Sequence, residues 1–428
     1  MYAQQRGLRR HANADITTKT KLAFPEHASV SGICSICTRD GMCEIGKKAR
    51  EGRTLFPEPF GAAQFGAEKR IPNLEDIQII PELYGDGVIF KEVKTETEFG
   101  GFRVKAPVSV AALGSTKVAH DQGAVLAKGA ARAGIPMVVG ESVLPTYGKQ
   151  GLKDRIKPYD DNRTKYGAVV VQGNPHDIKE GVFELGKSFG ADAIEIKLGQ
   201  GAKQNLGGEV KITGEREAKR YEKLGYFMVK NPDGSYQRHA NPGSINEEEL
   251  RDLMIKKAEL DLPIWIKTGI GRGIVKLVSM LDRIKKEHGV PLKCLTIDGF
   301  GGGTGMSPWL VMNETSLPTG AVFGTLHSKP DFDIMVGGGY NTGFDIGKLM
   351  MLGADGVSMG RAFLIATCEK EEGVVNFTKA IQEELQMVCA IQRVKSVEEL
   401  IGRRKNLYAL SEEAERLYGI TRKPEEVL

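Results

Sequence analysis

The chain has 428 residues, of which 41% are hydrophobic and 27% charged, and its formal net charge is +4. This composition is typical of a globular protein, no apolar run is long enough to span a membrane, and so mild a charge gives no indication of nucleic-acid binding. The basic start of the chain lacks the apolar core of a secretory signal, so we expect a cytoplasmic protein.

Eight short apolar runs alternate with helical segments from about residue 105 onward. These runs are 106–113, 135–140, 166–173, 191–199, 262–269, 292–299, 333–339 and 353–360. Continuous apolar runs are typical of strands buried on both faces of a parallel sheet. The fold class is therefore predicted to be α/β, as a (β/α)8 TIM barrel, with an open doubly wound sheet as the alternative.

Sequence outside the repeat suggests three regions. We expect an N-terminal extension with a cysteine cluster at 1–100, the barrel at 101–370, and a helical segment packed on the barrel at 371–428. A polar insert at 200–250 follows the fourth predicted strand. Because active sites of barrels lie at the carboxyl ends of the strands, we expect the insert to overhang that face.

Glycine-rich segments follow the last three predicted strands. They are "GFGGGTG" at 299–305, which includes Gly302 and Gly303, the glycines at 337–339, and "MGRA" at 359–362. Without a Cβ the backbone N–H groups can converge on a phosphate, and Arg361 would add a bidentate contact. We predict a phosphate-bearing ligand at these loops; tight turns without a ligand are the alternative.

Polar side chains close two of the predicted strands, Lys267 in "IWIKTG" and Gln172 in "VVVQG". A lysine at a barrel mouth is costly unless it faces a negative or electron-rich group. Beside a flavin it would stabilise the negative charge that develops on reduction, and Gln172 would bind the polar edge of the ring. The alternatives are a salt bridge at the rim for Lys267 and a hydrogen bond to a loop for Gln172.

The motifs "IEIKLGQGAKQNLGGEV", "LTIDGFGGGTGMSP" and "VGGGYNTGFDIGKLMMLGADGVSMGRA" resemble the FMN-binding synthase domain of glutamate synthase, over about residues 85–405. The resemblance implies a flavin-dependent oxidoreductase acting on CH–NH2 groups, in which ammonia condenses with 2-oxoglutarate and reduced FMN delivers hydride to the imine. The FMN-binding residues that it implies are Ala112, Leu113, Gly114, Gln172, Lys267, Gly338, Gly339, Gly360 and Arg361. The catalytic residues are expected to be Lys267, Glu141, Lys197, Gln200 and Lys203, with the lysines at 197 and 203 binding the carboxylates of the keto acid.

Three clustered cysteines, Cys34, Cys37 and Cys43, have the C-x2-C spacing that binds iron–sulfur clusters or zinc. The resembled family has its own cluster motif after the eighth strand, where this chain keeps only Cys368. We predict that these four cysteines hold a [4Fe–4S] cluster beside the flavin; zinc and unligated thiols are the alternatives. Cys389 is an alternative fourth ligand, and Cys294 is expected to be buried on a core strand.

The chain departs from the family pattern on the substrate side. We expect no glutamine amidotransferase domain, because Tyr2 stands where a processed chain would expose a cysteine nucleophile. Only Glu141 matches in the loop after the second strand, and Gly301 replaces an expected acidic residue. Four insert residues either line an altered pocket or lie at the surface: Tyr221, Tyr226, Arg238 and His239.

The expected partners are therefore a small keto acid and an amine, with ferredoxin or a partner redox or amidotransferase subunit, and a homo-oligomer is a further expectation. Two alternative functions stay open. A 2-hydroxy-acid oxidase or an isomerase would need a histidine base at a strand end, where we expect none. A non-catalytic electron-transfer subunit would carry flavin and cluster without a substrate.

Overall fold

The structure is a computed structural model that describes residues 71–428, except 202–203, 207–209, 242–245, 301–306, 309–310, 312–313 and 327. Its centre is a closed barrel of parallel strands in the order β11-β12-β13-β14-β4-β5-β6-β7. The strands are β4 (Val108–Leu113), β5 (Met137–Val139), β6 (Val169–Gly173), β7 (Ala193–Lys197), β11 (Ile264–Gly269), β12 (Leu292–Asp298), β13 (Asp333–Gly337) and β14 (Gly356–Met359). All eight predicted strands are present, and the TIM-barrel prediction is confirmed.

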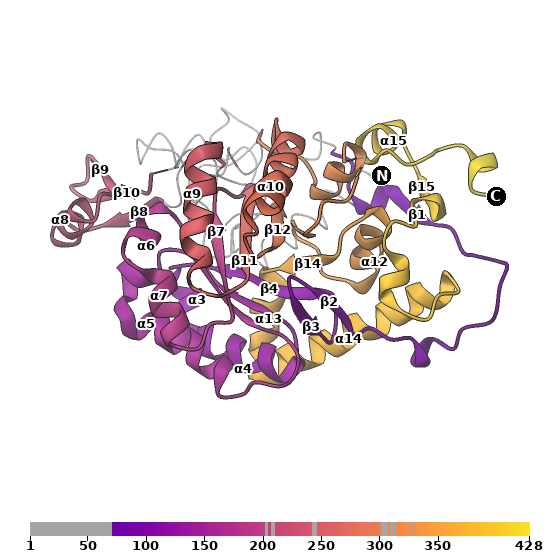
Figure 1. Ribbon diagram of the computed structural model, residues 1–428, viewed down its shortest axis with the longest axis horizontal. Coiled ribbons are helices and arrows are strands. Elements are labelled where there is room, and N and C mark those ends of the chain that lie inside the picture. The colour runs from indigo at the N-terminus through magenta and orange to yellow at the C-terminus, as the bar shows by residue number, and fades with distance from the viewer. Residues whose placement is uncertain are drawn as a thin grey trace, which may run out of the picture.

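Helices surround the barrel (Figure 1). They are α3 (Lys117–Asp121), α4 (Gly123–Ala133), α5 (Val143–Asp160), α6 (Pro175–Lys179), α7 (Val182–Ser188), α9 (Glu247–Ala258), α10 (Ile274–His288), α12 (Gly343–Leu352), α13 (Arg361–Ala366) and α14 (Lys370–Ile391). The longer helices pack through an apolar face: in α10, for example, Leu277, Leu281 and Ile284 are buried at helical spacing. No helix in the described parts of the chain is long and apolar enough to cross a membrane.

A hairpin closes the amino-terminal end of the barrel. Strands β2 (Thr97–Phe99) and β3 (Phe102–Val104) pair in antiparallel fashion, and the buried ring of Phe99 lies 6.3 Å from that of Trp265, centroid to centroid. The Trp265 Nε1 donates to the carbonyl of Gly100 at 2.9 Å. A Cβ at Gly100, whose φ is +62°, would lie 2.3 Å from the Trp265 ring, so the turn requires glycine.

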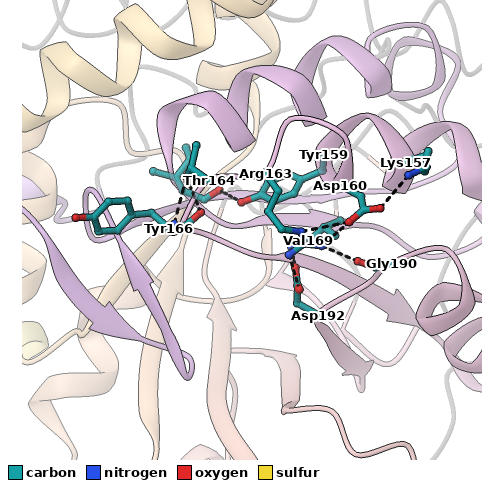
Figure 2. Close-up of polar contacts among 10 residues, drawn as sticks. Lys157, Tyr159, Asp160, Arg163, Thr164, Tyr166, Val169, Gly190 and Asp192 are labelled. Carbon is teal, nitrogen blue, oxygen red and sulfur yellow. Dashed lines mark hydrogen bonds and ion pairs between the residues drawn. The ribbon is translucent and has the colours of Figure 1, made fainter.

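A polar cluster lies near this end of the barrel, where α5 leads into β6 (Figure 2). The guanidinium of Arg163 pairs with Asp160 at 3.1 Å and with Asp192 at 2.5 Å, and it donates to the carbonyl of Gly190 at 2.9 Å. Asp192 also accepts from the backbone N–H of Val169 at 2.8 Å. These contacts fix the starts of neighbouring strands, which is a structural role, because catalytic residues of barrels gather at the opposite end.

The insert after β7 is a small α/β unit, seen at the left of Figure 1. Strands β8 (Val210–Thr213), β9 (Phe227–Lys230) and β10 (Tyr236–His239) form an antiparallel sheet in the order β8-β10-β9, and α8 (Glu215–Lys223) packs beside it. It follows the carboxyl end of a barrel strand, as the sequence predicts.

The end of the chain packs on the barrel. Helix α14 lies against α4 and α12, and α15 (Glu412–Tyr418) contacts the short 3-10 segment Thr319–Gly324 that follows β12. Strand β15 (Leu407–Ala409) pairs with β1 (Ile77–Ile79), so the two ends of the described chain meet in one small sheet. The three-region division of the chain stays a prediction, and the β2–β3 hairpin spans its first boundary.

Candidate active site

Polar side chains from neighbouring strands meet at the carboxyl end of the barrel. Glu141 follows β5, and Lys197 is the last residue of β7. Both are buried and form an ion pair. The Lys197 Nζ also donates to the Oε1 of Gln200 at 2.6 Å, and Glu141 accepts from the side-chain amide of Asn174 at 3.2 Å. Three of the residues predicted for the substrate side thus lie together, whereas Lys203 falls outside the described residues.

Gln172 is held by a residue that the sequence analysis did not identify. Its Nε2 donates to the carboxylate of Glu195 at 2.6 Å, and its Oε1 accepts from the backbone N–H of Glu141 at 3.3 Å. Glu195 lies on β7 and also accepts from the hydroxyl of Thr296 on β12 at 2.7 Å. Its carboxylate therefore links strands inside the barrel. Burial raises the pKa of Glu195. The sequence did contain a signal for Glu195: it lies within the apolar run "AIEIK", and a carboxylate buried there needs a hydrogen-bond or ionic partner.

Lys267 lies in the second half of β11, inside the barrel mouth, and 5% of its surface is exposed. Its Nζ lies 3.0 Å from the Oδ2 of Asp298, the last residue of β12. Burial alone would lower the pKa of Lys267, but the negative charges of Asp298 and Glu195 outweigh it and the net pKa is raised. The lysine is therefore a fixed positive charge at neutral pH, buried beneath the mouth of the barrel.

The residues predicted to bind phosphate converge after β13 and β14. Gly339 has a φ of +86°, and a Cβ placed there would lie 3.2 Å from the Nη2 of Arg361. A Cβ at Gly338 would lie 2.9 Å from the Oγ1 of Thr319, so the backbone is packed closely. Gly360 immediately precedes Arg361 at the start of α13. Gly302 and Gly303 lie outside the described residues.

Arg361 forms no ion pair with any described residue. Burial lowers the pKa of Arg361, and its guanidinium has no hydrogen bond or ion pair with any other described residue. An arginine that is desolvated and unpaired is costly, and its donor geometry matches the oxygens of a phosphate. The donor set at this corner of the barrel therefore fits a phosphate group.

The end of β4 and the residue after it supply the residues predicted to face a flavin ring, Ala112, Leu113 and Gly114. A Cβ at Gly114 would lie 2.9 Å from the carbonyl of Glu141, and one at Gly140 would lie 2.5 Å from the carbonyl carbon of Leu113. The loops after β4 and β5 thus touch through bare backbone. This contact joins the predicted flavin side to the Glu141–Lys197 pair.

The predicted cluster ligands are not brought together by the described residues. Cys34, Cys37 and Cys43 fall outside them, and Cys368 is exposed, in the 3-10 turn Thr367–Glu369 after α13. No group of three or more potential metal ligands occurs among the residues that are described. Cys294 is buried on β12 as expected, and Cys389 is buried in α14 with its pKa raised by burial to about 12, which disfavours a ligand role.

Insert residues pack on one another as a small core. Tyr221, Tyr226 and Arg238 are buried, so the expectation that they lie at the surface is wrong. The guanidinium carbon of Arg238 lies 3.9 Å from the Tyr221 ring centroid and 4.8 Å from that of Tyr226. Such cation–π stacking replaces the hydration that the arginine loses. His239 is partly buried and contacts Gln237.

His176 attaches the insert to the barrel. It lies in α6, just past β6, and its ring stacks on Tyr226 at 4.5 Å between centroids. Its Nε2 accepts from the backbone N–H of Asn241 at 3.0 Å, and a backbone contact with Leu224 occupies the ring further. A histidine therefore does occur near a strand end, contrary to expectation, but the Asn241 hydrogen bond on its Nε2 and its stacking on Tyr226 make it a connector between insert and barrel.

Acidification is expected to loosen this attachment. Burial lowers the pKa of His176, and the charge of Lys179 acts in the same direction. A lowered pKa means that the stability given by neutral His176 is complete above the unfolded value of about 6.5 and is lost as the pH falls. We expect Asn241 to lose about 1 kcal/mol of amide-exchange protection between pH 7 and pH 5. In His176→Gln, whose side-chain oxygen accepts without titrating, protection should stay constant; an equal loss in that variant would contradict this.

Comparison with known proteins identifies the family. The model described as "Conserved region in glutamate synthase" matches residues 86–370. Archaeal-type glutamate synthase [NADPH] of Thermotoga neapolitana is 26% identical over 51% of this chain and 41% of its own length. A glutamate synthase large subunit-like protein of Rhizobium meliloti is 25% identical over 61% of this chain and 55% of its own length. The chain spans about half the length of these curated relatives.

Solved structures share the fold. The flavin-binding domain of baker's yeast flavocytochrome b2 gives a TM-score of 0.55 at 19% identity, covering 79% of this chain and 77% of that chain. A mandelate oxidase variant with an FMN adduct gives 0.51 at 19% identity, covering 77% and 87%. These likenesses concern the barrel alone. With the family model matched across the whole barrel, the chain belongs to the glutamate synthase family.

Proposed function

We propose that this protein is an FMN-dependent oxidoreductase that reduces an imine formed from a 2-keto acid, such as 2-oxoglutarate, and ammonia or another amine. The observation that carries the proposal is a pair of cations at the barrel mouth, of which Lys267 is buried and Arg361 is partly buried. Arg361 lies beside Gly339 with no anionic partner among the described residues, and Lys267 lies beneath the mouth, beside Asp298. A ligand with a phosphate at one end and an electron-rich ring at the other suits both cations, and family membership supports FMN.

When bound, FMN would supply the hydride. The chain's own residues would do the remaining work. Arg361 and the backbone at Gly338, Gly339 and Gly360 would hold the phosphate. The segment from Ala112 to Gly114 at the end of β4 would lie against the ring, and Lys267 would stabilise the negative charge that reduction places on it.

The substrate side rests on the Glu141–Lys197 pair. An ammonium group has three donors, and two of those on Lys197 point to Glu141 and Gln200. We assign the third to an oxygen of the keto acid. Glu141 neutralises much of the charge of Lys197, so recognition of a dianionic substrate would also depend on Lys203.

Electron supply is the second part of the proposal. Cys34, Cys37, Cys43 and Cys368 would ligate a [4Fe–4S] cluster, and a ferredoxin or a partner subunit would feed it; an amidotransferase partner would supply ammonia. The exposure of Cys368 supports its role, because its thiol can be reached by another segment. We expect Cys34→Ser to lose iron, sulfide and the absorbance at about 400 nm while keeping FMN. Iron and sulfide absent from anaerobically purified wild-type protein would refute the cluster, and zinc in their place would support the alternative metal.

The function is tested by loading the anaerobic protein with FMN, reducing it, and mixing it with 2-oxoglutarate and ammonia together and separately. Flavin reoxidation that requires both compounds, with glutamate formed in equal amount, is the expected result. Other keto acids and simple amines extend the screen, because the substrate side departs from the family pattern. Reduction of the oxidised flavin by 2-hydroxy acids would instead favour the hydroxy-acid oxidase alternative, and no response to any compound would favour a non-catalytic electron-transfer subunit.

A further inference from the structure

Helix α5, on the outside of the barrel, holds the loop that follows β4. Arg155 on this helix is 2% exposed, and its Nη1 donates to the carbonyl of Leu113 at 3.0 Å and to that of Gly114 at 2.7 Å. The hydroxyl of Tyr147, from the first part of the same helix, donates to the next carbonyl, that of Ser115, at 3.1 Å. Two side chains of α5, one on each side of the break at Gly148, therefore fix three successive carbonyls.

The direction of these carbonyls sets the direction of the N–H groups. In a trans peptide the C=O and N–H point in opposite directions. The Leu113 carbonyl accepts from Arg155 and also from the backbone N–H of Gly140 at 3.1 Å, so the following N–H, that of Gly114, is turned away from both. It donates no hydrogen bond to another described residue and is left for a ligand.

Burying the charged side chain of Arg155 is unfavourable for folding. Among the described residues, its Nε and Nη2 have no hydrogen-bond partner and no carboxylate forms an ion pair with it. Burial lowers the pKa of Arg155 to about 10, so it remains charged at neutral pH. The side chain fits because residue 123 is glycine: a Cβ there would lie 3.0 Å from the Arg155 Cγ. A buried, unpaired cation whose bonds go to loop carbonyls is more costly than an apolar residue would be, which points to a role beyond stability.

We propose that Arg155, assisted by Tyr147, is a positioning residue that presents the backbone of residues 113–115 to the flavin ring and thereby sets flavin affinity and reduction potential. This inference rests on the proposed binding of FMN. The arginine acts through the loop and touches no reacting atom. Tyr147 is braced in turn by His120, whose ring stacks on it at 3.9 Å between centroids.

The test compares full-length Arg155→Met, Arg155→Lys and Tyr147→Phe with wild type. Each is stripped of flavin, titrated with FMN, and then measured for midpoint potential and thermal unfolding. We expect Arg155→Met to weaken FMN binding about tenfold or more and to lower the potential, because two charge-assisted hydrogen bonds are lost. Tyr147→Phe should weaken binding by about two- to fivefold. Arg155→Lys keeps the charge without the fork, so it should not restore affinity.

The matched control is Arg393→Met. Arg393 also donates to two backbone carbonyls, those of Glu82 at 3.0 Å and Gly85 at 2.8 Å, but these belong to a segment outside the barrel. It should alter thermal unfolding alone. Wild-type protein that binds no FMN would refute the proposed function itself. Wild-type protein that binds FMN, with Arg155→Met unchanged in affinity and potential or Arg155→Lys indistinguishable from wild type, would overturn the positioning role.

Discussion

Replacing Lys267 with methionine is expected to destabilise the fold by about 3–5 kcal/mol and to lower the reduction potential of bound FMN. The loss of stability has a local cause: Asp298 and Glu195 are buried beside the ammonium group, and without it their carboxylates would be uncompensated. The reduction potential of FMN should fall because the reduced ring would lose a neighbouring positive charge. A tenfold difference in affinity between the two flavin forms corresponds to about 30 mV.

The two effects can be separated with a second substitution. Lys267→Met combined with Asp298→Asn removes both charges of the ion pair, so that Asp298 is no longer left without its lysine. Most of the stability should therefore return, while the reduction potential stays low. Chemical denaturation of the apoprotein and potentiometric titration of the holoprotein are the measurements. Recovery of the potential in the double variant would mean that Lys267 acts only through the fold, and a single variant with unchanged flavin affinity and potential would refute its assignment.

Replacing Arg361 with methionine is expected to weaken FMN binding by roughly 10- to 100-fold without destabilising the apoprotein. This combination is unusual for a partly buried arginine. It follows because Arg361 has no partner among the described residues, so methionine removes a desolvated charge and strands no anion. Titration of the stripped protein with FMN, beside an unfolding curve without flavin, measures both quantities.

Riboflavin is the matched ligand control for Arg361, because it has the same ring without the phosphate. Its affinity should be lower than that of FMN in the wild type and equal in wild type and Arg361→Met. A variant that loses riboflavin and FMN affinity to the same extent would place Arg361 beside the ring or in the fold. A variant that keeps full FMN affinity would refute the phosphate site.

The barrel could be predicted because its strands are continuous apolar runs that end in glycine or in single polar residues. Runs such as 166–173 indicate burial on both faces, and that pattern is independent of contacts made elsewhere in the chain. The candidate site was predicted in part for the same reason: Lys267, Lys197 and Gln172 close such runs. Glu195 was missed because it interrupts a run in the middle, where its partners Gln172 and Thr296 come from other strands.

By itself, the sequence indicated eight parallel strands and the end at which polar residues collect, because these follow from the local alternation of apolar and glycine-rich segments. The tertiary structure decided that the sheet closes into a barrel, which excludes the open doubly wound alternative. Only the tertiary structure decided which charges are compensated. Lys197 is paired with Glu141 and Lys267 with Asp298, whereas Arg361 has no described partner. Ion pairing depends on distances of a few ångströms between segments far apart in the chain, and a linear pattern contains no information about those distances.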